Sequence, residues 1–493
     1  RDVLGSRGLG DVYKRQMTNR LIARQRECEE LQSCMDSNES EFVIVCGRRR
    51  IGKTFLVEQF FEGKYDFKFV GGHNLRTRDQ LNNFAKALKA YSGTKPAPFK
   101  DWVDAFDALE DYLSTLPDDR RKVIFIDEMP WMDSRRSDFV SALEYFWNGW
   151  ASSQYNIVLV ATGSATSWMT DKLIKNRGGL HNRIRHRIYL KPFSLKETEE
   201  YLQSRSVHWD RYQILQGYML TGGVPFYLKM LEPQQSFAQN VDRLCFSDTG
   251  ALKMEFDELY NAIFPGAESY VEVVRALADN KSGLTRTEIS TKTKISGAYL
   301  TRILTNLERC DFIDKTNLFG NRRTDAVYRL VDFYTLFYFK FVENNLSRDD
   351  QWWTHHIESS SIHSWMGFTF ELICMLHHAQ IKKALGISGM ATSVSTWRCS
   401  ADKENGTSGA QIDMIIERAD RIIHLCEMKF SEGAYNITGE YEAKLRNRRE
   451  LFRLKTKTKK SVVHTFVTTY GVGEGKYHSI VHSEVTMDDL FNS

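Results

Sequence analysis

The sequence predicts an α/β protein that is built on a parallel sheet and carries a second α/β domain at its C-terminal end. Between residues 41 and 190, runs of β-branched and aromatic residues alternate with helical patterns, which is typical of a parallel sheet. Two short polar motifs follow two of these runs, where the strands would end. Between residues 365 and 468, a helix precedes strands that carry acidic residues.

The first motif joins an apolar run, 42–46, to a helical pattern that begins near residue 53. Its glycines let backbone N–H groups approach phosphate oxygens without a Cβ in the way. Lys53 supplies a positive charge to the terminal phosphates, and the Thr54 hydroxyl is placed to ligate Mg²⁺. The motif therefore predicts a phosphate-binding loop, which consists of Gly47, Arg48, Arg49, Arg50, Ile51, Gly52, Lys53 and Thr54.

The second motif follows the apolar run 122–126 and begins with two acids, Asp127 and Glu128. An acid at the carboxyl end of a buried strand lies in the crevice of an open α/β sheet. We expect Asp127 to hold Mg²⁺, directly or through water. We expect Glu128 to orient or deprotonate an attacking water.

Other residues of this region have two interpretations each. At the tip of the predicted strand 156–164, Thr162 or Ser164 senses the terminal phosphate, or Ser164 caps a helix. Arg183 is either an arginine finger, acting in its own subunit or on a neighbouring one, or a surface residue of a basic stretch.

Composition excludes several classes of protein. The chain has 493 residues, of which 42% are hydrophobic and 26% charged, and a formal net charge of +4. This length predicts three or four domains, and the small net charge does not by itself indicate nucleic-acid binding. The eight cysteines form no metal-ligand spacing, and no apolar run is long enough to span a membrane. We therefore expect a cytoplasmic protein.

The first 16 residues stand apart from the rest. They do not begin with Met, and they resemble the translated adapter read-through found at the ends of metagenomic gene predictions. We expect residues 1–16 to be a non-native or disordered segment and the native chain to start at Met17.

Four motifs in this order resemble the archaeal-type ATPases, an AAA+/STAND-like family of P-loop NTPases. They are the phosphate loop, Ile-Asp-Glu-Met-Pro-Trp at 126–131, Ala-Thr-Gly-Ser at 161–164 and Gly-Gly-Val-Pro-Phe-Tyr-Leu at 222–228. The resemblance implies a P-loop ATPase core over 17–194, a helical lid over 195–265, and ATP with Mg²⁺ as the bound cofactors. It also implies that Pro225 lies near the base of the nucleotide.

Residues 266–345 have the pattern of a winged helix-turn-helix domain. A capping box of Thr285 and Glu288 begins one helix, a second helix spans 297–309, and a polar loop at 317–325 separates two short strands. The exposed face of the second helix either meets a DNA groove or docks on another protein surface. Its residues are Tyr299, Thr301, Arg302 and Asn306.

The residues that follow predict a packed helix and then a boundary. Residues 333–341 are dense in aromatic side chains, which favours a buried helix between domains over a platform for bases. Residues 346–361 are polar, and we expect an irregular domain boundary there.

Four polar residues of the C-terminal domain, 346–493, form a pattern suited to metal-dependent chemistry. Glu371 lies on a predicted helix, Asp413 on a strand, and Glu427 and Lys429 two apart on one face of the next strand. The carboxylates can bind Mg²⁺ against a phosphate, and Lys429 can stabilise charge or activate water. The alternative for Glu427 and Lys429 is a cross-strand surface pair, although a buried acid without a partner is costly.

This order of an acid, an Asp and a Glu-x-Lys resembles the PD-(D/E)XK nuclease superfamily, whose fold is restriction-endonuclease-like. No proline precedes Asp413, unlike the pattern in the superfamily's name. The resemblance implies catalytic roles for Asp413, Glu427 and Lys429. It also implies a metal ion held by these two acids, with Glu371 either completing the metal shell or orienting Lys429.

These patterns predict a Mg²⁺-dependent, ATP-hydrolysing enzyme that is coupled to a DNA-binding or DNA-cleaving domain, in defence or mobile-element control. The expected partners are ATP, DNA through the winged helix and the C-terminal domain, and further copies of the chain, with no membrane. The alternative is a STAND-like nucleotide-dependent switch, or a transcriptional regulator, whose C-terminal domain only binds.

Overall fold

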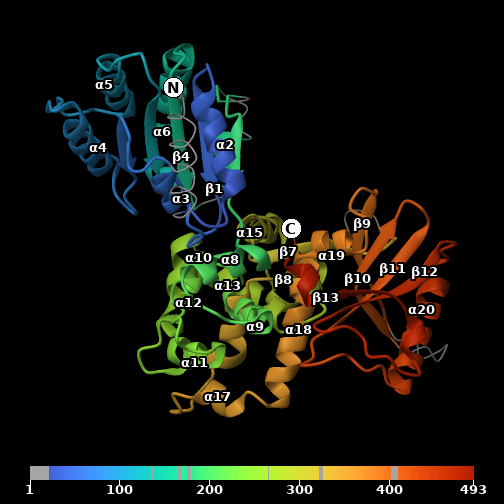
Figure 1. Ribbon diagram of the computed structural model, residues 1–493. Coiled ribbons are helices and arrows are strands. Elements are labelled where there is room, and N and C mark those ends of the chain that lie inside the picture. The colour runs from blue at the N-terminus through green and yellow to red at the C-terminus, as the bar shows by residue number, and fades with distance from the viewer. Residues whose placement is uncertain are drawn as a thin grey trace, which may run out of the picture. The chain divides into compact units, whose positions relative to one another are not determined.

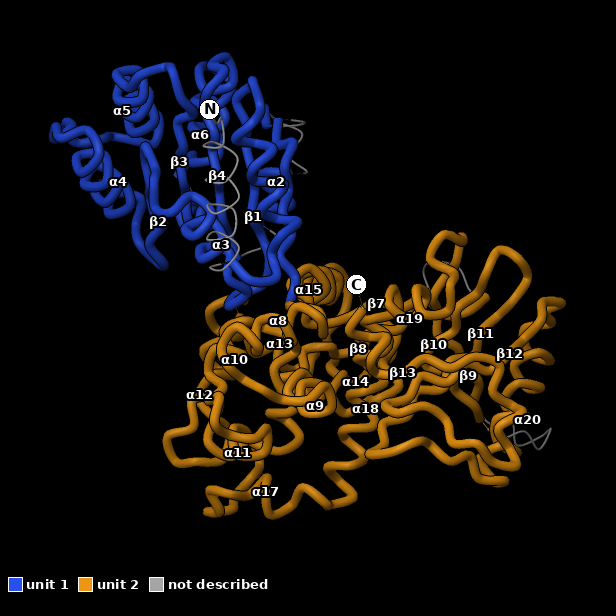
Figure 2. Tube along the Cα trace, in the orientation of Figure 1, with its two compact units in different colours: residues 1–192 blue, residues 193–493 orange. Residues whose placement is uncertain are grey.

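The chain divides into two compact units, residues 1–192 and 193–493 (Figure 2). The predicted boundary at 194–195 adjoins this division, whereas those at 265–266 and 345–346 fall inside the second unit. The predicted segment 1–16 lies outside the described residues, and so does much of the predicted wing loop. The computed structural model describes residues 21–492 except 135–136, 165–167, 175–178, 181–182, 265, 321–325 and 401–408.

The first unit is a parallel sheet with helices on both faces (Figure 1). Its strands, in sheet order, are β2 (Phe67–Val70), β3 (Lys122–Asp127), β4 (Ile157–Gly163), β1 (Glu41–Cys46) and β5 (His186–Tyr189). Its helices and helical turns are α2 (Gln25–Asp36), α3 (Lys53–Phe60), α4 (Thr77–Ser92), α5 (Trp102–Ser114), η1 (Met129–Met132), α6 (Phe139–Gly149), η2 (Ala151–Ser153) and η3 (Met169–Ile174).

Alternate residues of β1 account for the two layers of helices. Phe42 and Ile44 pack in one core with α4, α5 and α6, while Val43 and Val45 pack on the other face with α2 and α3. A strand that is apolar on both faces is typical of a buried parallel sheet. All strand pairs in this sheet are parallel, so the predicted α/β fold class is confirmed.

The second unit begins with a helical segment, 195–263, and a three-stranded module, 267–330. The helical segment contains α8 (Leu195–Ser204), α9 (Arg211–Thr221), α10 (Pro225–Leu228), α11 (Phe237–Val241), η4 (Asp242–Phe246) and α12 (Ala251–Ile263). The three-stranded module contains α13 (Ala267–Ala278), β6 (Leu284–Thr285), α14 (Arg286–Thr293), α15 (Gly297–Arg309), β7 (Ile313–Asn317) and β8 (Ala326–Leu330), with the sheet order β6-β8-β7.

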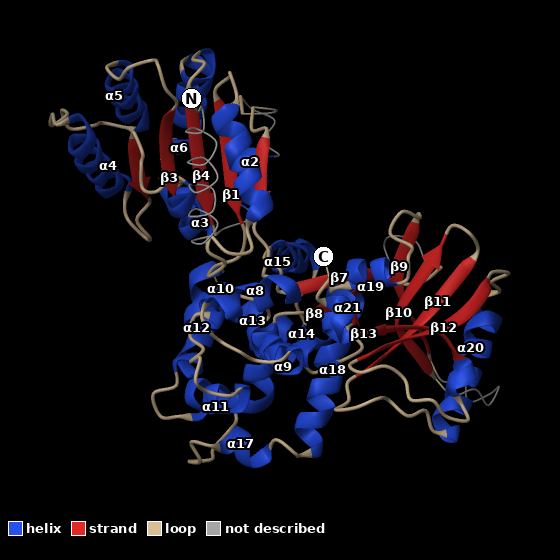
Figure 3. Ribbon diagram, viewed as in Figure 1, coloured by secondary structure: helices blue, strands red, loops and turns tan. Residues whose placement is uncertain are grey.

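A C-terminal module, 360–490, completes the second unit with a mixed sheet of order β13-β12-β11-β10-β9 (Figure 3). Strands β9, β10 and β11 are antiparallel, whereas β11, β12 and β13 are parallel. The module consists of α18 (Ser360–Leu376), α19 (His378–Ala384), β9 (Thr392–Cys399), β10 (Ala410–Arg418), β11 (Ile422–Lys429), α20 (Gly439–Thr456), β12 (Ser461–Thr468), η6 (His478–Ile480), β13 (Val481–Thr486) and α21 (Met487–Leu490). Within the described residues, no helix combines the length and the apolar character needed to cross a membrane.

The aromatic stretch after β8 is largely buried, as predicted, and the segment predicted to be an irregular boundary contains a short helix. The stretch forms α16 (Phe333–Phe337) and η5 (Tyr338–Val342), and α17 (Trp352–His356) lies within the predicted boundary. Trp353 is fully buried against Phe237, Phe337, Phe341 and Trp365. Most residues of this segment are polar, so its composition did not indicate that Trp353 would pack in the core.

We expect Trp353→Ala to destabilise the second unit by about 3–5 kcal/mol, because a buried indole leaves a large cavity. The measurement is chemical denaturation of the full chain, followed through the transition of the second unit. Leu346→Ala is the matched control, since Leu346 is 96% exposed. Equal stability of the two variants would contradict the packed role of α17.

Candidate functional site

The predicted phosphate loop lies between the end of β1 and the start of α3. Gly52 has a φ of 90° and Gly47 a φ of 155°. A Cβ on Gly47 would lie 2.4 Å from the carbonyl oxygen of Leu190, which forbids a side chain there. The two glycines therefore set the path of the loop, and the N-terminus of α3 gives it the direction that favours a bound anion.

Lys53 and Thr54 connect this loop to the ends of two neighbouring strands. The Lys53 ammonium is buried and donates to the Ser164 hydroxyl at 2.9 Å and to the Arg48 carbonyl at 3.1 Å. The Thr54 hydroxyl donates to the Asp127 carboxylate at 3.0 Å. The loop, the end of β3 and the end of β4 thus meet at one edge of the sheet.

The two acids of the second motif have different surroundings. Asp127 ends β3 and accepts hydrogen bonds from the hydroxyls of Thr54 and Thr162. Burial raises the pKa of Asp127 above its usual value, and the charge of Glu128 raises it further. Glu128 has left-handed backbone, with a φ of 48°, and its carboxylate accepts from the Ser164 hydroxyl at 2.8 Å.

Oxygen donors dominate this edge of the sheet, which is the chemistry that Mg²⁺ requires. Thr54 and Asp127 are the residues that could hold the ion, and this role stays a prediction. Ser164 contacts both Lys53 and Glu128, and this contact favours the phosphate-sensing interpretation. The residues that would form a helix directly after Ser164 lie outside the described part of the chain.

The remaining loop residues differ in burial, and Pro225 belongs to the other unit. Arg48 is 2% exposed and Ile51 packs in the core beside β1, whereas Arg49 and Arg50 are half-buried. Pro225 begins α10 in the second unit, so its predicted place near the nucleotide base stays a prediction.

Arg183 lies at the wrong edge of the sheet for a finger in its own subunit. It precedes β5 and is exposed. It lines a hollow of about 350 Å³ together with Ser40, which precedes β1, and Tyr155, which precedes β4. The amino ends of these parallel strands lie opposite the phosphate loop. A role in a neighbouring subunit stays a prediction.

In the C-terminal module, Glu427 is buried on β11 and is held by two residues of α20. The Tyr441 hydroxyl donates to it at 2.7 Å and Arg448 donates to it at 2.5 Å. The Lys429 ammonium lies 4.9 Å from the centre of the Tyr441 ring, so Lys429 and Glu427 share a face of the strand. Glu427 is therefore not a surface residue of a cross-strand pair.

Glu371 and Asp413 complete a group that we call the carboxylate site: Glu371, Asp413, Glu427 and Lys429. Burial raises the pKa of Glu371 to about 8, with further contributions from the negative charges of Asp413 and Glu427, while Lys429 lowers it. Asp413 accepts a hydrogen bond from Gln411. The fold thus brings together all four residues selected from the sequence.

The carboxylate site fits a divalent cation in chemistry but is not fully arranged for one. The negative charges of Asp413 and Glu427 help to raise the pKa of Glu371, and a cation would relieve this repulsion. However, among the described residues, the group of three such side chains with ligand atoms within 4.8 Å of one another is Glu358, His363 and Glu432, which are all exposed. The ligand atoms of the predicted metal set are therefore farther apart than this limit, and Glu427 is already paired with Arg448 and Tyr441.

Two outcomes differ from the sequence predictions. Tyr441 was not expected as a partner of Glu427, and Asn306 was expected on the exposed face of the second helix but is half-buried. Tyr441 and Arg448 lie seven residues apart, and this spacing was the available signal, because it places them on one helix face. On α15, Tyr299, Thr301 and Arg302 are exposed as predicted. The Asn306 amide instead donates to the Tyr270 hydroxyl at 2.7 Å, toward α13.

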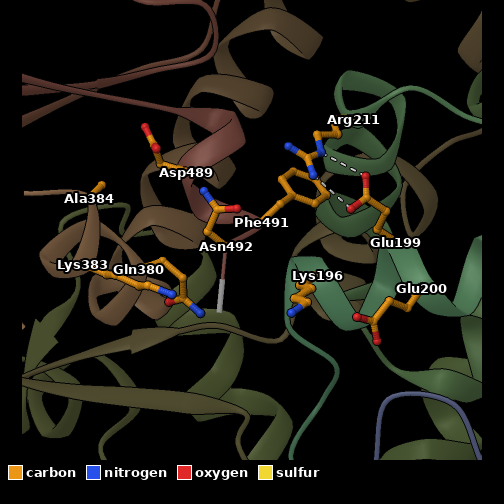
Figure 4. Close-up of a pocket in the computed structure, with 10 residues that line it drawn as sticks. All are labelled: Lys196, Glu199, Glu200, Arg211, Gln380, Lys383, Ala384, Asp489, Phe491 and Asn492. Atoms are coloured by element: carbon orange, nitrogen blue, oxygen red, sulfur yellow. Dashed lines mark hydrogen bonds and ion pairs between the residues drawn. The ribbon is translucent and has the colours of Figure 1, made fainter.

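A hollow of about 480 Å³ lies between α8, α9, α19 and the residues after α21 (Figure 4). Arg211 donates to Glu199 at 2.9 Å and lies 4.8 Å from the centre of the Phe491 ring. A further ion pair of 2.9 Å joins Arg211 to Asp488. These contacts tie the helical segment to the end of the chain, and we assign the hollow no ligand.

Residues 21–231 match the family described as an ATPase domain predominantly from Archaea. The chain carries an archaeal-type ATPase domain. An uncharacterised protein of Methanocaldococcus jannaschii is 23% identical over 380 residues, 76% of this chain and 81% of that protein. An uncharacterised ATP-binding protein of the same organism is 40% identical over 43 residues, 9% of this chain and 73% of that protein.

Similar solved structures are distant. A Walker-type ATPase of Pyrococcus abyssi has a TM-score of 0.45 and 18% identity, with 64% of this chain and 95% of that one covered. The ORC2 protein of Aeropyrum pernix has a TM-score of 0.42 and 14% identity, with coverage of 64% and 91%. A STAND protein of Pyrococcus horikoshii with a tetratricopeptide repeat sensor has a TM-score of 0.30 and 14% identity, with coverage of 75% and 52%.

In the ATPase domain, we expect Lys53→Ala to weaken ATP binding by roughly 10- to 150-fold, the equivalent of losing one charged hydrogen bond of about 1.5–3 kcal/mol. Titration with a fluorescent ATP analogue measures this change. Arg183→Ala is the control and should bind ATP as the unaltered chain does. Equal weakening in both variants would contradict the position of the site at the carboxyl edge of the sheet.

Proposed function

We propose that this chain is a Mg²⁺-dependent ATPase whose C-terminal module is a metal-dependent DNA nuclease. The observation that supports the nuclease is the meeting of three carboxylates and one lysine, drawn from α18, β10 and β11. An anionic cluster of this kind beside a lysine suits a cation that binds a phosphodiester.

At the proposed nuclease site, Asp413 and Glu427 would hold the metal ion, with Glu371 beside them. The ion would polarise a phosphate oxygen and lower the pKa of a water molecule. Lys429 is half-buried, with its ammonium over the Tyr441 ring, and would offer this ammonium to the negative charge that develops on the phosphate. Arg448 would leave Glu427 when the ion binds, since both compete for one carboxylate.

At the nucleotide site, Lys53 would bind the terminal phosphates and Ser164 would report their presence. Glu128 would orient the water that attacks the γ-phosphate. The Ser164 hydroxyl joins Lys53 to Glu128 through two hydrogen bonds, which a bound phosphate would compete with. Nucleotide binding would therefore rearrange this network, and that change is the basis for a nucleotide-dependent signal.

The three-stranded module would act as a winged helix that contacts DNA. Its order of helix, short strand, two helices and hairpin suits that fold. Thr301 and Arg302 on the exposed face of α15 would contact DNA.

The helical segment would act as the lid that passes the nucleotide signal to the nuclease. The ring of Tyr212 on α9 stacks on Phe430, with 5.0 Å between ring centres and 18° between planes. Phe430 directly follows Lys429, and α9 also packs against α18, which carries Glu371. A shift of α9 would therefore displace both Phe430, next to Lys429, and α18, which carries Glu371.

We expect Lys429→Ala to lower the rate of DNA cleavage by about 10²–10⁴-fold, because it removes the group that assists charge or proton transfer. Cleavage of single- and double-stranded DNA is measured with Mg²⁺ or Mn²⁺, with and without ATP. Lys444→Ala is the matched control, since Lys444 is exposed on α20 and pairs with Glu440. Equal cleavage by both variants, or no cleavage by the unaltered chain while it hydrolyses ATP, would contradict the nuclease.

We expect Tyr212→Ala to leave ATP hydrolysis intact and to abolish the effect of ATP on DNA cleavage, since the contact between α9 and Phe430 is lost. The ratio of cleavage rates with and without ATP is the measurement. Tyr201→Ala is the control, because the Tyr201 ring packs on Phe193 at 5.6 Å. If Tyr212→Ala retains the full ratio, the signal does not pass through this contact.

A further inference from the structure

The three-stranded module covers the edge strand of the C-terminal sheet. The backbone of Thr396 in β9 forms a bridge with Leu318, and its carbonyl accepts a hydrogen bond from the Phe319 N–H at 2.8 Å. An ion pair of 2.8 Å joins Arg398, also in β9, to Glu288 of α14. The two modules thus share a continuous interface along β9.

Asp413 of the carboxylate site lies in an irregular part of β10 at this interface. The pairing of β10 with β9 slips between Ile412 and Ile415, so that Asp413 and Met414 both stand opposite Thr396. A bulge of this kind bends a strand and re-aims a side chain. The Thr396 hydroxyl donates to the Ile412 carbonyl at 2.9 Å and so fixes the start of the bulge.

Arg329 of β8 reaches this bulge from the three-stranded module. Its Nη2 donates to the Thr396 hydroxyl at 3.0 Å, and the residue is 3% exposed. Its Nη1 is buried and has no hydrogen-bond partner among the described residues. Burial lowers the pKa of Arg329, and Asp413 is the charge that opposes this effect most, ahead of Asp314.

A buried guanidinium nitrogen without a partner is costly for the folded state. Asp314 stands opposite Arg329 in the neighbouring strand, but its carboxylate accepts from Thr316 at 2.6 Å. The hydrogen bond of Arg329 therefore crosses the interface, to the Thr396 hydroxyl beside Asp413. An arginine that served only to join two modules would pair with a carboxylate at the interface, as Arg398 does.

We propose that Arg329 is a positioning residue of the carboxylate site. Through the Thr396 hydroxyl it holds the bulge that carries Asp413, and the bulge sets where the Asp413 carboxylate stands. This inference rests on the proposed nuclease function and names the residue that sets its metal geometry. The site is then composite, because the three-stranded module completes it.

The test is Mn²⁺ binding to the full chain by isothermal titration calorimetry. Arg329→Met should weaken the Mn²⁺ site by about 10- to 100-fold, the usual effect of removing a residue that orients a metal ligand. Thr396→Val should weaken it in the same direction. The double variant should lose no more than Arg329→Met alone, because both residues act through one hydroxyl. Thr396→Val also keeps the test valid if Arg329→Met fails to fold.

Two further variants separate the outcomes. Asp413→Ala should lose the Mn²⁺ of the carboxylate site and keep any Mn²⁺ bound at the phosphate loop, so it identifies which binding event belongs to the carboxylate site. Arg398→Met is the matched control, since it removes a guanidinium from the same interface, and its Mn²⁺ affinity should be unchanged. If Arg329→Met and Thr396→Val bind Mn²⁺ normally, Arg329 does not position the site. The same conclusion follows if Arg398→Met loses as much affinity as Arg329→Met. Either result leaves the proposed metal site itself standing. If Asp413→Ala binds as many Mn²⁺ ions as the unaltered chain, there is no metal site at Asp413. The proposed nuclease site and the role of Arg329 are then both contradicted.

Discussion

Carboxylates at or near the ends of buried strands impose the main constraint on this structure. An ionised carboxylate loses several kcal/mol of hydration on burial, so it is stable only where donors surround it. Asp127 at the end of β3 is satisfied by Thr54 and Thr162. Glu427 near the end of β11 is satisfied by Tyr441 and Arg448. In both units the donors that stabilise the acid come from neighbouring elements of the fold.

This constraint explains which parts of the sites could be predicted from the sequence. The phosphate loop and Asp127 depend on local order, a strand followed by a turn and a helix, and a parallel sheet places all such turns at one edge. Ser164 follows the same rule. The rule also applies to Arg183, which precedes the predicted strand 184–190 and therefore belongs to the opposite edge. This placement disfavours a finger within one subunit, and a role on a neighbouring subunit stays a prediction.

Contacts that depend on tertiary packing could not be predicted. Arg448 lies 21 residues after Glu427 and Tyr441 lies 14 residues after it, so their contacts depend on how α20 packs on the sheet. Strand β9 escaped prediction because serine and threonine fill much of it and weaken the hydrophobic pattern. Helix α6 escaped because its sequence, rich in aromatic residues, resembles a strand as much as a helix.

The edge strand β9 shows why the modules of the second unit depend on each other. An exposed edge strand has unpaired N–H and C=O groups, which can pair with a strand of another chain and cause aggregation. Here the end of β7 covers part of that edge at Thr396, and the ion pair of Arg398 with Glu288 lies beside it. The same cover brings the buried Arg329 to the bulge beside Asp413. The cover of the edge strand and the proposed positioning of Asp413 therefore depend on the same contact, between Arg329 and Thr396.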